Sequence, residues 1–180
     1  HWRNWMPITY YCTHSLAPLM FVTGEEPVQV NCLVLPRDPN DREHFGDTAK
    51  RNDLAAVFLL RMRNGAVVKL LWGQLRGLGA WVSVRCTRGM MENLRTGDTK
   101  MLRVRREPFD RNSNETIEQV YLPEFPKPFD KAGLDGHSGA DICVYHEFAE
   151  AIRGKSAPFF DVYRAVAMSL VGIQAYRSAL

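Results

Sequence analysis

Short runs of apolar residues, alternating or continuous, occupy the middle of the chain. Residues 56–63 and 66–72 are two β-rich runs separated by Asn64 and Gly65. Asn-Gly between such runs favours a type I′ turn, in which both residues have positive φ, so the sequence predicts a β-hairpin there. Further strands are predicted at residues 28–35, 81–86, 90–94 and 101–105. The short links between most of these strands indicate an antiparallel meander.

Near the start of the chain the pattern changes from extended to helical. Residues 9–11 favour extended backbone, whereas residues 16–21 carry apolar side chains at helical spacing. Proline is tolerated in the first turn of a helix, where its missing N–H has no partner to lose. The sequence therefore predicts Ser15 as the N-cap, with Pro18 in the first turn and Gly24 ending the helix.

Two more helices are predicted near the other end of the chain. The first has its apolar stripe at residues 141–152 and is terminated by Gly154. The second begins after Asp161, which is a suitable N-cap. Their apolar positions are Val144, Tyr145, Phe148 and Ile152 in the first helix, and Val162, Ala165, Val166, Met168, Leu170, Ile173 and Tyr176 in the second. Residues 107–135 contain four prolines and few periodic apolar residues, so we expect a long loop there.

These elements predict an α+β fold, with an open, mainly antiparallel β-sheet and helices packed on one face. The helices are too few to cover both faces of such a sheet. Trp72, Trp81, Met90 and Met91 are candidates for the uncovered face. We therefore expect self-association through the sheet face, the alternative being that the long loops cover it.

Composition narrows the class of protein without specifying a function. At 180 residues, with 46% hydrophobic and 24% charged residues, the chain is typical of one globular domain. The net charge of +3 is small and the basic residues are dispersed, so we expect no nucleic acid as a partner. Membrane-spanning apolar runs are missing, and we expect no membrane partner either.

The cysteines favour neither a metal site nor a disulfide framework. Cys12, Cys32, Cys86 and Cys143 are isolated from one another, without a Cys-x-x-Cys pair or a histidine at ligand spacing. Free thiols suit a reducing compartment, so a cytoplasmic location is the expectation.

His14 is the first candidate for chemistry. At the predicted strand-to-helix turn it would lie near the positive end of a helix dipole, which disfavours the imidazolium. A largely neutral His14 could accept a proton from a hydroxyl, and Tyr11 could place its phenol in the same space. The structural alternative is that His14 only caps a turn and that Tyr11 packs in the core.

Three segments add a resemblance to these observations. Residues 11–18 read Tyr-Cys-Thr-His-Ser-Leu-Ala-Pro, residues 136–141 read Gly-His-Ser-Gly-Ala-Asp, and residues 161–165 read Asp-Val-Tyr-Arg-Ala. They resemble Tyr-x-Thr-His-Gly-Leu-Gly-Pro, Gly-His-Gly-Gly-x-Asp and Asp-Val-Tyr-x-Ala in one branch of the Gfo/Idh/MocA oxidoreductases. That branch includes NAD-dependent glycoside hydrolases. The matches cover nearly the whole chain but only the carboxy-terminal domain of the family.

The resemblance implies that residues 1–180 are a single substrate-binding and oligomerisation domain of an NAD(P)-dependent oxidoreductase acting on a sugar or polyol. It places the nucleotide-binding Rossmann domain outside these 180 residues. In agreement with this, the given sequence contains no Gly-x-Gly-x-x-Gly turn. Without that domain we expect neither tight binding of NAD or NADP nor turnover. By the same resemblance His14 and Tyr11 are the expected catalytic residues. The expected substrate-binding residues are Arg3, Asn4, Tyr10, His137 and Asp141.

Departures from the family pattern leave other functions open. Ser15, Ala17 and Ser138 replace glycines of the signatures. In the broader family an Asp lies four residues before the histidine and another three after it, where this chain has Tyr10 and Ala17. The alternatives are a domain of an NAD-dependent glycoside hydrolase that works by oxidation and elimination, and a non-catalytic scaffold domain. For His137 and Asp141, the structural alternative is an Asp that caps a helix and a His that anchors the loop.

Overall fold

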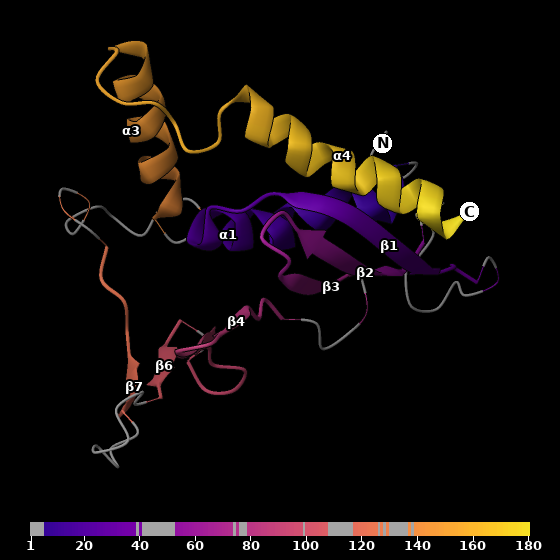
Figure 1. The fold of residues 1–180 in the computed structure, drawn as a ribbon, viewed down its shortest axis with the longest axis horizontal. Coiled ribbons are helices and arrows are strands. Elements are labelled where there is room, and N and C mark those ends of the chain that lie inside the picture. Colours follow the sequence, from indigo (N-terminus) through magenta and orange to yellow (C-terminus); the bar gives the residue numbers. More distant parts are fainter. Residues whose placement is uncertain are drawn as a thin grey trace. The chain divides into compact units, whose positions relative to one another are not determined.

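The protein is an α+β fold built from two antiparallel sheets, which confirms the predicted fold class (Figure 1). The computed structural model describes residues 6–38, 40, 53–73, 75, 79–98, 100–107, 117–125, 127, 129, 137 and 139–180. One unit contains residues 1–78 and 160–180, and the other contains residues 79–159. The predicted meander is thus divided into a three-stranded and a four-stranded sheet.

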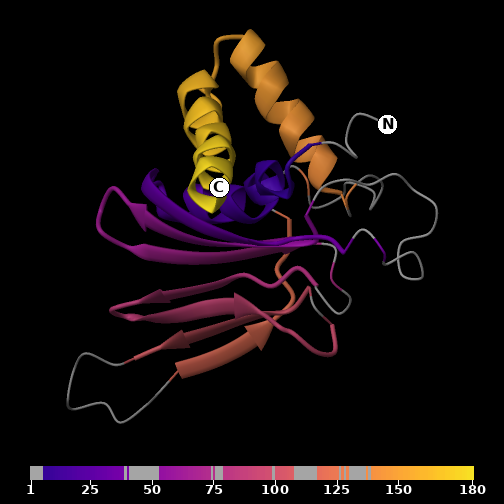
Figure 2. The ribbon, with the colours of Figure 1, turned by 90° about the vertical axis from the view of Figure 1, so that its right-hand side faces the viewer.

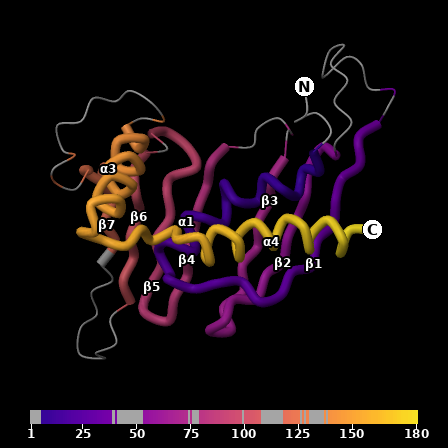
Figure 3. Tube along the Cα trace, turned by 90° about the horizontal axis from the view of Figure 1, so that it is seen from above, coloured from indigo at the N-terminus to yellow at the C-terminus, as the bar shows by residue number. Residues whose placement is uncertain are grey.

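The first unit is a three-stranded sheet with helices on one face. Its elements are η2 (Ile8–Cys12), α1 (Thr13–Thr23), β1 (Pro27–Leu35), β2 (Ala55–Met62), β3 (Val67–Gly73) and α4 (Val162–Ala179). The strands pair in the order β1-β2-β3. Figure 2 shows α1 and α4 on the same side of this sheet, and Figure 3 shows α4 running across β1 and β2. Helix α4 packs on β1 and on η2.

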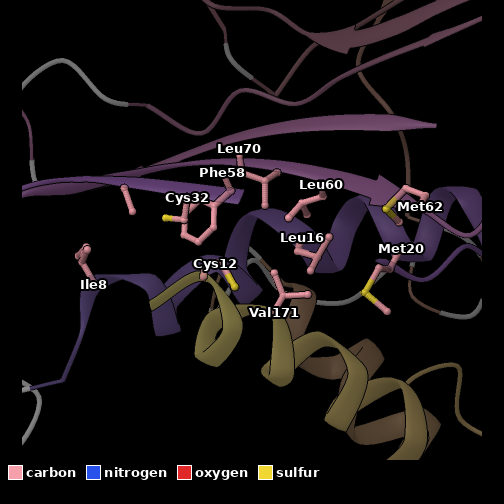
Figure 4. Packing of buried hydrophobic residues seen from close by; sticks show 12 residues of the cluster. Ile8, Cys12, Leu16, Met20, Cys32, Phe58, Leu60, Met62, Leu70 and Val171 are labelled. Carbon is pink, nitrogen blue, oxygen red and sulfur yellow. The ribbon is translucent and has the colours of Figure 1, made fainter. Parts of the chain in front are cut away.

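The core of this unit lies between the sheet and the helices. Ile8, Cys12, Leu16 and Met20 are all buried, and they are spaced four residues apart through η2 and α1 (Figure 4). From the sheet they meet residues of β1, β2 and β3, and Val171 comes from α4. This spacing is helical throughout, and its apolar burial stabilises η2 against the extended conformation. The predicted extended backbone at residues 9–11 is therefore wrong.

The start of α1 also differs from the prediction. Thr13 is its first residue and Cys12, in a right-handed helical conformation, is its N-cap, so Ser15 does not cap the helix. Pro18 lies inside the helix rather than in its first turn. Because proline lacks an N–H, it cannot donate to the carbonyl of His14 four residues earlier. Gly24 ends the helix as predicted, with φ of 70° and its N–H donating to the carbonyl of Met20 at 2.8 Å.

The hairpin between β2 and β3 is confirmed, but its turn is of a different type. Met62 donates to the carbonyl of Ala66 at 2.8 Å, and Gly65 donates to the carbonyl of Met62 at 2.9 Å. Gly65 has φ of 88°, whereas Asn64 is not among the described non-glycine residues with positive φ. This is a three-residue loop, a type I turn followed by a left-handed glycine. The Asn64 side chain accepts from the N–H of Ala66 at 3.0 Å.

The other face of this sheet is exposed, and part of it is apolar. Along β2, residues alternate between buried and exposed from Ala56 to Met62. Leu33, Val57 and Leu71 form one row across the outer face, because Val57 pairs with both of the others. Their exposed fractions are 78%, 41% and 46%. Trp72 was a candidate for this face, but it packs against the buried core instead.

The second unit holds a four-stranded antiparallel sheet. Its strands are β4 (Ser83–Cys86), β5 (Gly89–Asn93), β6 (Leu102–Arg106) and β7 (Ile117–Tyr121), paired in that order. Strand β7 falls within residues 107–135, where a loop was predicted. Its backbone is paired with β6, and Arg103 forms ion pairs with Glu92 on one neighbour at 3.3 Å and Glu118 on the other at 3.6 Å. Pairing across strands thus stabilises a segment with little apolar periodicity.

Both predicted carboxy-terminal helices are present. Helix α3 spans Ala140–Ile152, and the carboxylate of Asp161 caps α4 by accepting from the N–H of Arg164 at 2.9 Å. The buried face of α4 contains Val171, Gly172 and Ala175. The other apolar positions of the two helices are mostly exposed, among them Val144, Tyr145, Phe148, Ile152, Val162, Val166 and Leu170. Among the described residues, no helix is long and apolar enough to span a membrane.

Candidate functional site

Tyr11 and His14 lie side by side where η2 passes into α1. Tyr11 is half-buried and packs against the core, whereas the side chain of His14 is exposed. Their ring centroids are 5.7 Å apart, with the ring planes tilted by 47°. A separation of three residues brings both side chains to one surface of a helical segment. The predicted catalytic pair is thus placed together, although in a helical turn instead of a strand-to-helix junction.

Trp72, from the end of β3, joins this pair. Its ring stacks on Tyr11 with centroids 5.9 Å apart and an interplanar angle of 15°. The ring of His14 lies 5.1 Å from that of Trp72, tilted by 32°. We call Tyr11, His14 and Trp72 the aromatic cluster. Sequence analysis missed Trp72 as a site residue, since nothing in its local sequence connects it with residues some sixty positions earlier.

His14 has one described hydrogen-bonding neighbour, Thr13. The Nδ1 atom of His14 lies 3.4 Å from Oγ1 of Thr13, and either atom can donate, depending on the tautomer of the ring. At this distance the bond is weak. If Nδ1 carries the proton, Nε2 is left with a free lone pair, which is the state needed to accept a proton from a hydroxyl.

Beneath the cluster, Cys12 is a packing residue rather than a nucleophile. The residue is fully buried, and burial raises the pKa of its thiol to about 12, with a smaller contribution from Cys32. Burial likewise raises the pKa of Cys32 to about 11, and the charge of Asp53 adds to the effect. Both thiols are therefore uncharged near neutral pH, and the thiolate is the reactive form.

Tyr10 lies on the same 3-10 helix, at its contact with α4. It is 37% exposed. A Cβ atom on Gly172 of α4 would lie 3.0 Å from the Cα of Tyr10 and 2.9 Å from the carbonyl oxygen of Thr9. This close approach fixes the backbone that carries Tyr10 and Tyr11.

His137 and Asp141 form a pair in the second unit. Nδ1 of His137 lies 2.8 Å from Oδ1 of Asp141, and the two side chains are 84% and 42% exposed. His137 has φ of 40°, a left-handed conformation that is strained for a residue with a side chain. The N-cap of α3 is Gly139, without a side-chain capping bond, so Asp141 lies in the first turn of the helix rather than at its cap.

Not all predicted residues belong to one described site. His14, Tyr11 and Tyr10 lie in the first unit, and His137 and Asp141 in the second. Arg3 and Asn4 lie outside the described residues. Within the described ranges, no group of three or more His, Cys, Asp and Glu side chains is arranged to hold a metal ion.

The described residues do not fit a dinucleotide cofactor. Every strand pairing among them is antiparallel, whereas dinucleotides bind at the crossover of parallel strands. The sequence also lacks a Gly-x-Gly-x-x-Gly turn whose backbone could approach a pyrophosphate. What the described part of the first unit offers chemically at this turn is an exposed imidazole beside a phenol and an indole.

Comparisons with known proteins give matches in structure alone. No protein-family model matches the sequence, and no curated protein matches it. An NAD-binding oxidoreductase from Klebsiella pneumoniae is similar, with a TM-score of 0.71 and 17% identity over 93% of this chain and 46% of that one. Levoglucosan dehydrogenase, in complex with NADH and L-sorbose, has a TM-score of 0.61 at 17% identity, with the same coverage.

UDP-N-acetylglucosamine 3-dehydrogenase from Acidithiobacillus ferrooxidans is a third similar structure. Its TM-score is 0.57 at 18% identity, over 93% of this chain and 44% of that one. The chain thus spans less than half the length of each of these proteins. Such neighbours are oxidoreductases of the Gfo/Idh/MocA type, so the resemblance seen in the sequence is confirmed for the fold. The fold of this chain is similar to slightly less than half of each of these oxidoreductases.

Proposed function

We propose that this chain is the substrate-binding and assembly domain of an NAD(P)-dependent oxidoreductase that acts on a sugar or a similar polyol. The observation that carries the proposal is the placement of His14 and Tyr11, with ring centroids 5.7 Å apart where η2 passes into α1. The fold adds support, because similar structures include a levoglucosan dehydrogenase with bound L-sorbose and a UDP-N-acetylglucosamine 3-dehydrogenase.

In this proposal His14 handles the proton of the hydroxyl that is oxidised. A general base must come within hydrogen-bond reach of that proton, and His14 is exposed where a substrate can approach it. With the proton on Nδ1, near Oγ1 of Thr13, the lone pair of Nε2 would be free to accept the substrate proton. The Tyr11 phenol would hydrogen-bond a neighbouring hydroxyl and so orient the ring of the sugar.

We propose further that NAD or NADP is held mainly by a nucleotide-binding domain outside these 180 residues. The chain spans less than half of its structural neighbours, and its described strands do not fit a dinucleotide. The chain alone would then be inactive. The predicted substrate contacts remain Arg3, Asn4, Tyr10, His137 and Asp141. For His137 the structure adds a separate reason, because strained backbone conformations such as its own are concentrated at functional sites.

For assembly, we propose self-association through the outer face of the first sheet. The row Leu33, Val57 and Leu71 is apolar and exposed, and it crosses all three strands of the sheet. Burying such a row against a second copy removes apolar area from water, which is favourable.

A second candidate reaction is favoured by the motif that carries His14. The segment Tyr11-Cys12-Thr13-His14 resembles the branch with NAD-dependent glycoside hydrolases, in which a transiently formed ketone permits elimination of the glycosidic leaving group. Such an enzyme regenerates its cofactor, whereas a dehydrogenase accumulates the reduced form. The two activities therefore differ in their net products.

The test uses the complete protein that contains this chain, supplied with NAD or NADP. Free sugars and aryl glycosides are offered in parallel, and both NAD(P)H and released phenol are followed. We expect NAD(P)H to accumulate with a free sugar. Release of phenol without net NAD(P)H would instead establish the glycosidase, and turnover of neither substrate class would support the scaffold alternative.

A further inference from the structure

Trp72 contacts both members of the proposed catalytic pair at once. Val68, Leu70 and Trp72 alternate along β3 onto the face that packs against the core. At the end of this row the indole stacks on Tyr11, with centroids 5.9 Å apart, and meets His14 at 5.1 Å. Since Tyr11 and His14 also contact each other, the three rings form a closed triangle.

The ring of His14 depends on these contacts for its orientation. His14 is exposed, and its described hydrogen bond to Thr13 is long at 3.4 Å. A long bond to an adjacent residue does not fix the two side-chain torsions of a histidine. Aromatic contacts at 5 to 6 Å restrict the ring plane, because stacked and tilted arrangements are preferred over others.

From this geometry we infer that Trp72 is a positioning residue, which holds the His14 imidazole in the orientation needed for proton transfer. The inference rests on the proposed function of His14. Trp72 belongs to the rigid strand β3, whereas Tyr11 and His14 belong to η2 and α1, so the indole couples the sheet to the helical turn. It acts through His14 and does not itself contact the reacting atoms.

A purely structural Trp72 would behave differently. The indole also packs against the core, so its removal destabilises the unit in either case. Leucine keeps apolar volume but has no ring, whereas phenylalanine keeps a ring that can contact His14. A positioning role therefore predicts that Trp72→Phe retains function that Trp72→Leu loses, at similar cost to folding. Trp81→Leu is the matched control, because Trp81 contacts Arg95 in the second unit.

The first readout does not depend on activity. In the complete protein, with ¹³C at histidine Cε1, the ring currents of Trp72 and Tyr11 should displace the His14 signal from its free value. We expect Trp72→Leu to move this signal toward the free value, Trp72→Phe to retain part of the displacement, and Trp81→Leu to leave it unchanged. The His14 signal is assigned by its loss in His14→Ala. A His14 signal that is the same in Trp72→Leu as in the native protein would overturn the inference.

Turnover supplies the second readout. Misplacing a proton-transfer group by about 1 Å can cost up to about a hundredfold in rate. We expect Trp72→Leu to lower kcat by about tenfold or more with little change in KM, and Trp72→Phe to stay within about threefold of the native enzyme. Equal kcat in the native enzyme, Trp72→Leu and Trp72→Phe would overturn the inference. Unchanged turnover in His14→Ala would refute the proposed role of His14. That failure can be distinguished from a failure of the inference on Trp72, because the ring-current signal reports the contact between Trp72 and His14 without turnover.

Discussion

Gly172 of α4 lies directly against the carbonyl of Thr9 in η2. A Cβ atom at residue 172 would be 2.9 Å from that oxygen, which is closer than side-chain atoms normally come to it. The carboxy-terminal helix therefore touches the backbone that leads into Tyr11 and His14. This contact connects the two ends of the chain to the same site.

Gly172→Ala should destabilise the protein and reduce turnover. In an open helix position alanine is favoured over glycine by about 1 kcal/mol, but here η2 or α4 must shift to admit the methyl group, and overpacking typically costs about 1–3 kcal/mol. Urea unfolding measures the net effect. Gln174→Ala, at an exposed position of the same helix, is the control and should change stability by less than about 0.5 kcal/mol. A stabilised Gly172→Ala variant would mean that the close contact is absent.

The hairpin turn makes a prediction that separates two turn types. Gly65 has positive φ and Asn64 does not, so Gly65→Ala should cost about 1 kcal/mol or more of folding free energy, because a Cβ is strained in that conformation. Asn64→Ala should cost less, since it loses only the side-chain bond to the N–H of Ala66. In a type I′ turn the two substitutions would be similarly damaging. Chemical denaturation of both variants decides between the two turn types.

Cys12 and Cys32 make the stability of the fold sensitive to alkaline pH. Burial raises their pKa values to about 12 and about 11, from an ordinary value of 9.0. Between pH 9 and pH 11 the unfolded chain releases these protons while the folded chain keeps them. The free energy of unfolding should therefore fall as pH rises through this window, by roughly 1 kcal/mol per pH unit for each thiol. Below pH 9 their contribution is constant.

The measurement is the difference between the native protein and the Cys12→Ala, Cys32→Ala double variant in urea unfolding at pH 8 to 11. Subtracting the two curves removes the titration of tyrosines and lysines. The difference in unfolding free energy should shrink as pH rises. Parallel curves would show that the thiols are not shielded from water.

Self-association through the outer sheet face should be sensitive to one charge in the row Leu33, Val57 and Leu71. Val57 lies between Leu33 and Leu71 on the middle strand, so Val57→Arg places a cation in the apolar row. We expect the dissociation constant of the assembly to rise at least about tenfold, as measured by sedimentation velocity. Leu180→Arg, at the 90% exposed chain end, should leave the assembly unchanged. A native protein that stays monomeric at high concentration would refute the proposal.

Local sequence patterns predicted the elements that depend on local contacts. The hairpin followed from Asn64 and Gly65, the end of α1 from Gly24, and the start of α4 from the capping carboxylate of Asp161. The turn type was missed because the hydrogen bonds of Met62 with Gly65 and Ala66 close a loop of three residues, whereas a type I′ turn has a loop of two. Propensity alone does not specify that register.

Elements that depend on distant contacts were predicted less well. Thr9 and Tyr10 have side chains that favour strands, but Ile8 and Cys12 begin a series of buried residues four positions apart, and burial prevailed. The spacing of four residues in that series is the sequence pattern that could have predicted η2. Strand β7 requires its partner β6.

The aromatic cluster depended on distant contacts as well. The motif placed Tyr11 and His14 together. Trp72, however, reaches them through strand pairing and packing over some sixty residues of chain, which a motif cannot reveal.

The most direct test of the account is kcat/KM for His14→Ala in the complete protein, with the substrate that the panel of sugars and aryl glycosides identifies. His146→Ala is the control, because His146 lies on α3 against Phe129 and outside the aromatic cluster. If His14 transfers the proton of the oxidised hydroxyl, kcat/KM should fall at least about tenfold, the lower range for one proton-transfer group, while His146→Ala keeps the native value. An unchanged kcat/KM in His14→Ala would remove this residue from the mechanism and contradict the account.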